Sequence, residues 1–97
     1  MAVLITHTAA GMDTAAYDRV SPEIIEKLRD QPGFLLHLAL PGPEGIVVTE
    51  IWESQEQHDT WFDEHVAPNV PAEIRQEVVE IHNIVEPAGA AMLTSAI

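Results

Sequence analysis

The chain contains no cysteine and only four positively charged side chains among its 97 residues. Without cysteine it forms neither disulfides nor zinc-thiolate sites, and thiolate catalysis is excluded. The cations are Lys27, Arg19, Arg29 and Arg75, against sixteen acidic residues, so the formal net charge is −12. A basic patch for nucleic acid or an anionic membrane cannot be assembled from so few scattered cations. We therefore expect neither nucleic acid nor a membrane as a partner.

Long hydrophobic runs are absent as well. No apolar stretch approaches the roughly 20 residues that a membrane-spanning helix needs, and no basic region precedes the short apolar run at 2–5. These features predict a cytoplasmic protein. The length is that of one domain, which we place at residues 1–87, followed by an uncharged, apolar C-terminal tail at 88–97.

Turn and capping residues divide the chain into alternating strands and helices. Asp13 or Thr14 is a suitable cap for the first helix, which Pro22 interrupts as a kink or a restart, and Ser54 caps the second with Gln57 in capping-box spacing. Pro-Gly sequences at 32–33 and 41–42 end the segments before them. The expected elements are a strand at 2–8, a helix at 14–30, strands at 34–40 and 46–52, a helix from 55 to 66, one or two helical turns at 72–76, and a strand at 78–86.

This order predicts a ferredoxin-like α+β fold of the βαββαβ type, with an antiparallel sheet and both helices on one face. The first three strands are apolar on both sides, so the uncovered face would expose a large apolar surface in a monomer. A symmetric homodimer with sheet packed against sheet would bury it.

The second helix carries an apolar stripe that contains two imidazoles. At helical spacing one face holds His58, Trp61, Phe62, His65 and Val66, while acidic residues occupy the other face. A buried imidazole needs a hydrogen-bond partner, so this stripe is either the wall of a pocket or part of a core in which the histidines are satisfied. Both interpretations remain open at this point.

Several local sequences resemble those of a known family. They are Gly11, the entry Gln31-Pro32-Gly33-Phe34, the segment Glu50-Ile51-Trp52-Glu53-Ser54 and the pair Trp61-Phe62. Over residues 2–87 the chain resembles the antibiotic biosynthesis monooxygenase type of the dimeric α/β-barrel superfamily. The resemblance implies an α/β barrel formed by two sheets in a homodimer, and a ligand cavity in each subunit between helices and sheet.

The resemblance also implies an activity and a set of site residues. It implies a small enzyme, monooxygenase-like and without cofactor, that forms the anion of an aromatic or polyketide-like molecule with the help of a base and then oxygenates, cyclises or isomerises it. The catalytic candidates are His65 first and His37 second. The candidates for substrate binding are Trp61, Tyr17, His58, His82, His7 and Glu50. Each strand is apolar on both sides, so strand alternation does not tell which histidines face the helices.

Other functions remain as alternatives. If the histidines take no part in a reaction, two alternatives follow. The protein would be a non-catalytic binder of a hydrophobic metabolite, or a structural dimer without a cavity. Heme degradation is disfavoured, because Pro71 stands where the resemblance would place an axial histidine and the first strand has no asparagine. No metal is expected: His58 and His65 lie about 10 Å apart along one helix, and Glu50 with His37 or His82 forms a ligand set only if all three point inward. Nucleophile elbows and glycine-rich phosphate loops are also missing.

Overall fold

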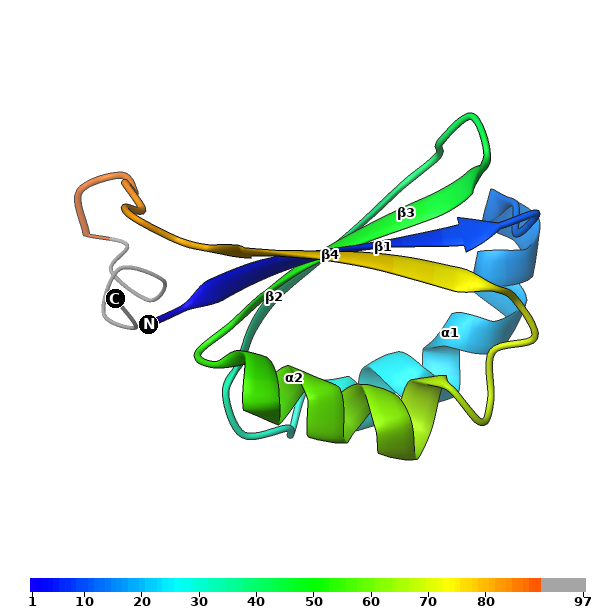
Figure 1. Cartoon of the computed structure of the whole chain (residues 1–97), viewed down its shortest axis with the longest axis horizontal. Coiled ribbons are helices and arrows are strands. Elements are labelled where there is room, and N and C mark those ends of the chain that lie inside the picture. The colour runs from blue at the N-terminus through cyan, green and yellow to red at the C-terminus, as the bar shows by residue number, and fades with distance from the viewer. Residues whose placement is uncertain (90–97) are drawn as a thin grey trace.

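A computed structural model describes residues 1–89 of the chain. It contains one antiparallel sheet in the strand order β2-β3-β1-β4, with both helices on the same face (Figure 1). This is the expected ferredoxin-like fold. The elements are β1 (Val3–Ala10), α1 (Thr14–Leu28), β2 (Phe34–Leu40), β3 (Gly45–Trp52), α2 (Gln55–Trp61), the π-helical segment η1 (Phe62–Val66) and β4 (Ile74–Glu80).

The sheet register decides which polar residues face the helices. In β1 the buried positions alternate, and His7 is buried together with Val3, Ile5 and Ala9. His7 pairs with Val48 of β3, and Glu50 of β3 pairs with Ile5 on one side and His37 on the other. Paired residues project to the same face of a sheet. His7, His37 and Glu50 therefore all lie on the helix side, which the sequence could not decide.

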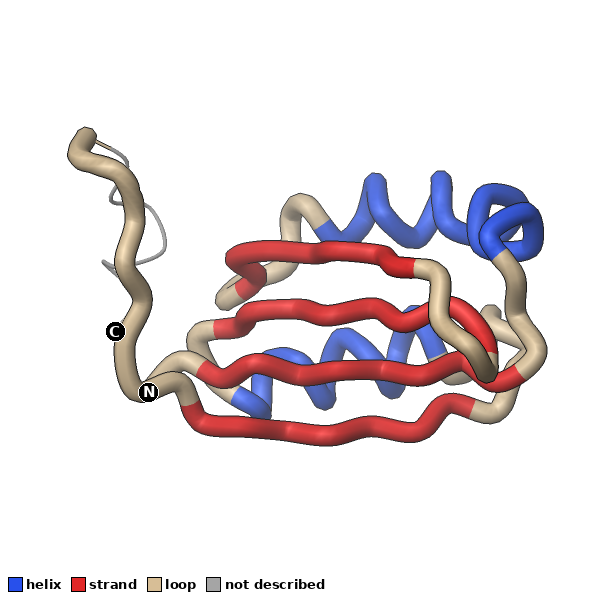
Figure 2. Tube along the Cα trace, turned by 90° about the horizontal axis from the view of Figure 1, so that it is seen from above, coloured by secondary structure: helices blue, strands red, loops and turns tan. Residues whose placement is uncertain are grey.

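Helix α1 begins at its predicted cap. The Asp13 side chain accepts a hydrogen bond from the Ala16 N–H at 2.8 Å. Pro22 lies inside the helix, which is continuous from Thr14 to Leu28, so the expected restart at Ser21 is wrong. The first turns of α1 run in a different direction from the later ones (Figures 1 and 2), as expected for a kink. Figure 1 shows α1 lying under the sheet, where its packing outweighs the one backbone hydrogen bond that a proline removes.

The second helix changes its winding after two turns. Ser54 caps α2 by accepting a hydrogen bond from the Gln57 N–H, as expected. From Phe62 onward the segment is π-helical, and the Ala67 N–H donates to the Phe62 carbonyl at 2.9 Å, five residues back. A π-turn holds more residues than an α-turn, so residues after Trp61 are rotated relative to the predicted stripe. His58 and Trp61 are buried, whereas His65 is not.

The C-terminal part differs from the expectation. No helical turn forms at 72–76, and the last strand is Ile74–Glu80 rather than 78–86. Ile74 pairs with Ala9 and Glu80 with Val3, so this segment takes up the free edge of β1. Isolated helical turns are costly to nucleate, whereas an edge strand gains a row of hydrogen bonds at once. His82 consequently lies beyond the sheet and is exposed; of the predicted tail, residues 90–97 lie outside the described part.

The two faces of the sheet differ in what covers them. On the helix side a core of Val3, Ile5, Leu28, Trp52 and Trp61 is buried. On the other side no helix of residues 1–89 lies, as both views show (Figures 1 and 2). Leu38, Leu40 and Val79 remain 49%, 49% and 59% exposed. Within residues 1–89 no helix has the length and apolar character that crossing a bilayer requires.

Candidate active site

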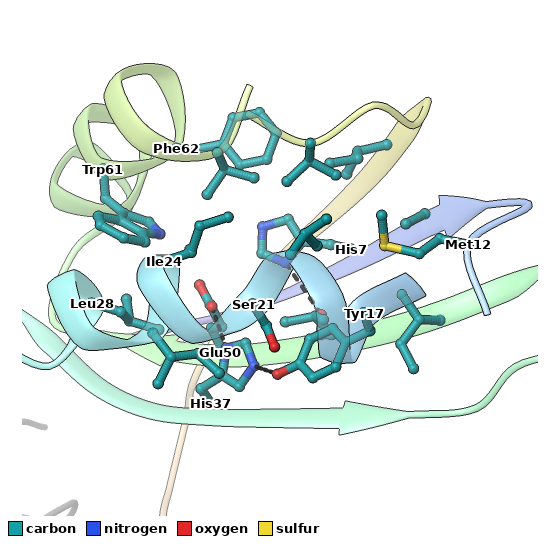
Figure 3. A pocket seen from close by; sticks show the side chains of 18 residues that line it. His7, Met12, Tyr17, Ser21, Ile24, Leu28, His37, Glu50, Trp61 and Phe62 are labelled. Atoms are coloured by element: carbon teal, nitrogen blue, oxygen red, sulfur yellow. Dashed lines mark hydrogen bonds and ion pairs between the residues drawn. The ribbon is translucent and has the colours of Figure 1, made fainter. Parts of the chain in front are cut away.

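A cavity of about 80 Å³ lies between the sheet and the two helices. Most of its lining is aliphatic or aromatic and includes Ile24, Leu28, Trp61 and Phe62. The polar members come from β1, α1, β2 and β3, and Figure 3 shows them gathered around one end of the space. They are His7, Tyr17, Ser21, His37 and Glu50.

Three of these side chains form a hydrogen-bonded chain across the sheet and α1. His37 Nδ1 lies 2.7 Å from Glu50 Oε2, and His37 Nε2 lies 2.7 Å from the Tyr17 hydroxyl (Figure 3). A carboxylate only accepts, so Nδ1–H is the donor to Glu50. In the neutral imidazole this leaves the lone pair on Nε2, which accepts from the Tyr17 O–H. The arrangement presents to the cavity the Tyr17 oxygen, whose proton points to the His37 base.

Glu50 is a buried carboxylate, 4% exposed. Burial by itself would raise its pKa, but hydrogen bonds from His37 and from the Trp52 indole outweigh burial and the pKa lies below its ordinary value. The Trp52 Nε1–H donates to Oε1 at 2.9 Å. Glu50 is therefore ionised at neutral pH, and it fixes the orientation of the His37 ring.

Tyr17 remains a neutral phenol. Burial raises its pKa above the ordinary value of 10.0, and the charge of Glu50 acts in the same direction. It is thus a hydrogen-bond donor at neutral pH, not a base in its own right.

A second hydrogen-bonded chain starts at His7. His7 Nδ1–H donates to the Val48 carbonyl at 3.2 Å, while His7 Nε2 lies 2.8 Å from His58 Nε2. His58 Nδ1 is 2.9 Å from Asp59 Oδ1. Burial, with a smaller contribution from the charge of His58, lowers the pKa of His7. Val48 and Asp59 thus occupy the two Nδ1 atoms, and the two Nε2 atoms face each other.

The structure brings together five of the eight residues that the sequence singled out. His7, Tyr17, His37, Glu50 and Trp61 line the cavity. His58 is fully buried behind His7 and does not reach the cavity.

The two remaining candidates lie elsewhere. His65, the first catalytic candidate, lies outside the cavity lining, where its ring stacks on Trp61 with 4.6 Å between centroids. It lines a separate surface groove with Arg19 and Lys27. His82 is exposed beyond β4. His65 lies outside the cavity because of the π-turn, and His82 lies outside it because β4 ends at Glu80.

Sequence reasoning missed several residues of the site. Ser21 and Met12 line the cavity, Trp52 holds Glu50, and Asp59 holds His58. Ser21 carried a signal, because it lies four residues after Tyr17 and thus on the same face of α1. Asp59 carried no signal, because it falls on the acidic face of the second helix, away from the predicted apolar stripe.

The family model described as antibiotic biosynthesis monooxygenase matches residues 1–67, the greater part of the chain. The chain belongs to this family. The match includes β1, α1, β2, β3 and α2, and so every residue of the two hydrogen-bonded chains. No match was found among curated proteins.

Solved structures of antibiotic biosynthesis monooxygenases and their relatives share the fold. SnoaB from Streptomyces nogalater, described as a cofactor-independent oxygenase, aligns with a TM-score of 0.61 at 12% identity, covering 87% of this chain and 95% of its own. A putative antibiotic biosynthesis monooxygenase from Deinococcus radiodurans aligns with a TM-score of 0.63 at 18% identity, covering 92% of this chain and 100% of its own. The ActVA-Orf6 monooxygenase of Streptomyces coelicolor, solved with nanaomycin D, aligns with a TM-score of 0.57 at 15% identity, covering 90% of this chain and 92% of its own.

Proposed function

We propose that this protein is a small oxygenase that removes a proton from an aromatic carbon acid or phenol and lets the resulting anion react with dioxygen. The observation that carries the proposal is the chain Tyr17–His37–Glu50 in the wall of an otherwise apolar cavity. Support also comes from the fold shared with SnoaB and ActVA-Orf6, which are described as oxygenases.

The proton step uses the two 2.7 Å hydrogen bonds of His37. The substrate gives its proton to the Tyr17 oxygen, and the Tyr17 proton moves to His37 Nε2. The imidazolium that forms is paired with the Glu50 carboxylate, and the Tyr17 O–H then donates to the substrate anion. A positioned base of this kind contributes about 10² to 10⁴ in rate.

The oxygen step consumes one dioxygen for each substrate. The anion passes one electron to dioxygen, and the radical and superoxide combine to form a carbon–oxygen bond. The peroxide takes the proton from His37. Loss of the second proton from the same carbon then breaks the oxygen–oxygen bond, so that a CH₂ group becomes a carbonyl and the other oxygen atom leaves as water.

The size of the cavity limits how the substrate enters. A space of about 80 Å³ is smaller than the roughly 150 Å³ cavity that takes up benzene. A fused-ring substrate therefore needs the wall to move. Phe62 and Val66 line the cavity from the π-helical segment, whose hydrogen bonding departs from that of a regular helix. In this proposal they are the side chains that make room.

The test measures oxygen uptake with a hydroxylated anthrone in chelator-treated buffer. We expect the wild type to consume one dioxygen per quinone and to place one ¹⁸O atom from ¹⁸O₂ in the product. His37→Gln and Tyr17→Phe should each lose about 10²-fold or more in kcat, because the proton passes through both side chains. His82→Gln is the matched control, since His82 is exposed and distant from the cavity.

Other results would contradict the proposal. Uptake that persists in His37→Gln and vanishes in His65→Gln would move the base to the residue outside the cavity. Anthrone that binds without turnover in all variants would make the protein a binder of hydrophobic molecules.

A further inference from the structure

A buried group of potential metal ligands lies beside the cavity. His7, Glu50 and His58 come from β1, β3 and α2, are 7%, 4% and 0% exposed, and bring one ligand atom each to within 4.8 Å of one another. We propose that these three side chains bind one divalent first-row transition-metal ion. The proposal goes beyond the oxygenase function and does not depend on it.

The ring orientations of the two histidines support the proposal. Their Nε2 atoms face each other at 2.8 Å, whereas both Nδ1 atoms are occupied by oxygen acceptors, Val48 O and Asp59 Oδ1. Metal-binding histidines usually donate their second ring N–H to a backbone carbonyl or a carboxylate, which fixes the tautomer. Both rings therefore have the orientation of ligands whose Nε2 atoms share an ion.

The third ligand is held in a similar manner. Donors from His37 and Trp52 reach the two oxygens of Glu50. Each carboxylate oxygen keeps a further lone pair, because it accepts at more than one position. Glu50 can thus turn a lone pair toward the two Nε2 atoms while His37 and Trp52 fix the carboxylate.

Charge balance also favours a cation at this place. Two carboxylates, Glu50 as a ligand and Asp59 beside His58, lie at this place. A divalent ion binds imidazoles in their neutral form. The site then holds two positive charges of the ion against two carboxylates, within a chain of net charge −12.

The donor set indicates the kind of ion. Imidazole ligands favour zinc, copper, iron, cobalt and nickel over magnesium and calcium, and two histidines with one carboxylate suit an ion with open positions. The 2.8 Å separation fits a near-right angle at an ion about 2.1 Å from each nitrogen. His7 and Glu50 line the cavity and His58 lies behind His7, so the open positions would face the cavity.

The first test is a titration of metal-free protein with Co²⁺, followed by visible absorption and calorimetry. We expect one ion per chain with d–d bands of a low-coordinate site. His7→Gln and His58→Gln should lose the binding. Because those residues are buried, Asp59→Asn is a second variant at a half-exposed position, expected to weaken binding about 10- to 100-fold through the His58 ring. His82→Gln is the control for surface imidazoles.

The second test needs no substitution. Bound Co²⁺ should broaden the NMR signals of Phe62 and Trp52, whose rings lie next to His58, and leave those of His82 sharp. Absence of stoichiometric binding overturns the proposal and leaves a buried pair of histidines in contact. Binding that survives in His7→Gln and His58→Gln, or that maps to the acidic surface, overturns it equally. No substrate is used, so the result is independent of the oxygenase assay.

Discussion

At the scale of single residues, the site depends on one ionised carboxylate. Glu50 accepts from His37 and from Trp52, and it lies within the electrostatic reach of His7. It thus orients the proposed base and completes the proposed metal site. Glu50 therefore links the His37 ring to the His7–His58 pair.

Replacing Glu50 by Gln tests that role. The amide keeps the shape but removes the charge, and one of its ends presents a donor where His37 or Trp52 also donates. Hydrogen bonds to a buried charged group contribute about 1.5–3 kcal/mol each, so we expect the free energy of unfolding to fall by about 2 kcal/mol. Urea denaturation followed by tryptophan fluorescence measures it. A variant as stable as the wild type would contradict this assignment; Glu53→Gln, on the exposed side of the next turn, is the control.

The buried titratable groups predict how stability depends on pH. The pKa of His7 is lowered from 6.5, mainly by burial, and that of Glu50 is lowered from 4.5 by its hydrogen bonds in spite of burial. In both cases the unfolded chain takes up a proton at a higher pH than the folded chain. Stability should therefore fall as the pH drops below about 6.5 for His7 and further below about 4.5 for Glu50.

Chemical denaturation of metal-free protein between pH 8 and pH 4 measures this dependence. In Glu50→Gln the free energy of unfolding should fall less steeply with pH below pH 4.5 than in the wild type. A free energy of unfolding that rises on acidification would contradict the assignment of both groups.

At the scale of elements, the helix ends are locally encoded. Ser54 accepts from the Gln57 N–H and donates to the Gln57 side chain, which starts α2 and so places His58 and Trp61. Ser54→Ala should lower the free energy of unfolding by about 1 kcal/mol, as loss of a cap usually does. Thermal denaturation measures it, with Glu56→Gln on the exposed face as the control. An unchanged midpoint for Ser54→Ala would show that packing alone starts the helix.

The same helix shows where local rules fail. A regular 3.6-residue period placed His65 with His58 and Trp61, but the π-turn at Phe62–Val66 changes the phase, so that His65 leaves the cavity. The residue types of Phe62-Asp63-Glu64-His65-Val66 do not predict a π-turn. In the structure the π-turn occurs where the Phe62 ring packs against the rings of His7 and His58.

At the scale of the whole molecule, the part of the chain that the structure describes leaves one apolar face of the sheet without a helix. Leu38 and Leu40 on β2 are each 49% exposed, and we expect a second copy of the chain to cover them. Leu38→Lys with Leu40→Lys should convert a dimer to a monomer in analytical ultracentrifugation. Glu23→Lys on the outer side of α1 is the control for added charge. A wild type that sediments as a monomer would contradict the expectation.

The sequence by itself determined the order of strands and helices from β1 to α2, the cap at Ser54, and a choice of Asp13 or Thr14 as the cap of α1. These depend on neighbours within a few residues, where periodicity and capping chemistry act. Strand alternation, by contrast, has two equivalent answers when both faces are apolar. Only the pairing of β1 with β3 and of β2 with β3 placed His7, His37 and Glu50 on the same side. The site depends on contacts between residues 13 to 51 positions apart, and such contacts exist only once the tertiary fold has brought the strands and helices together.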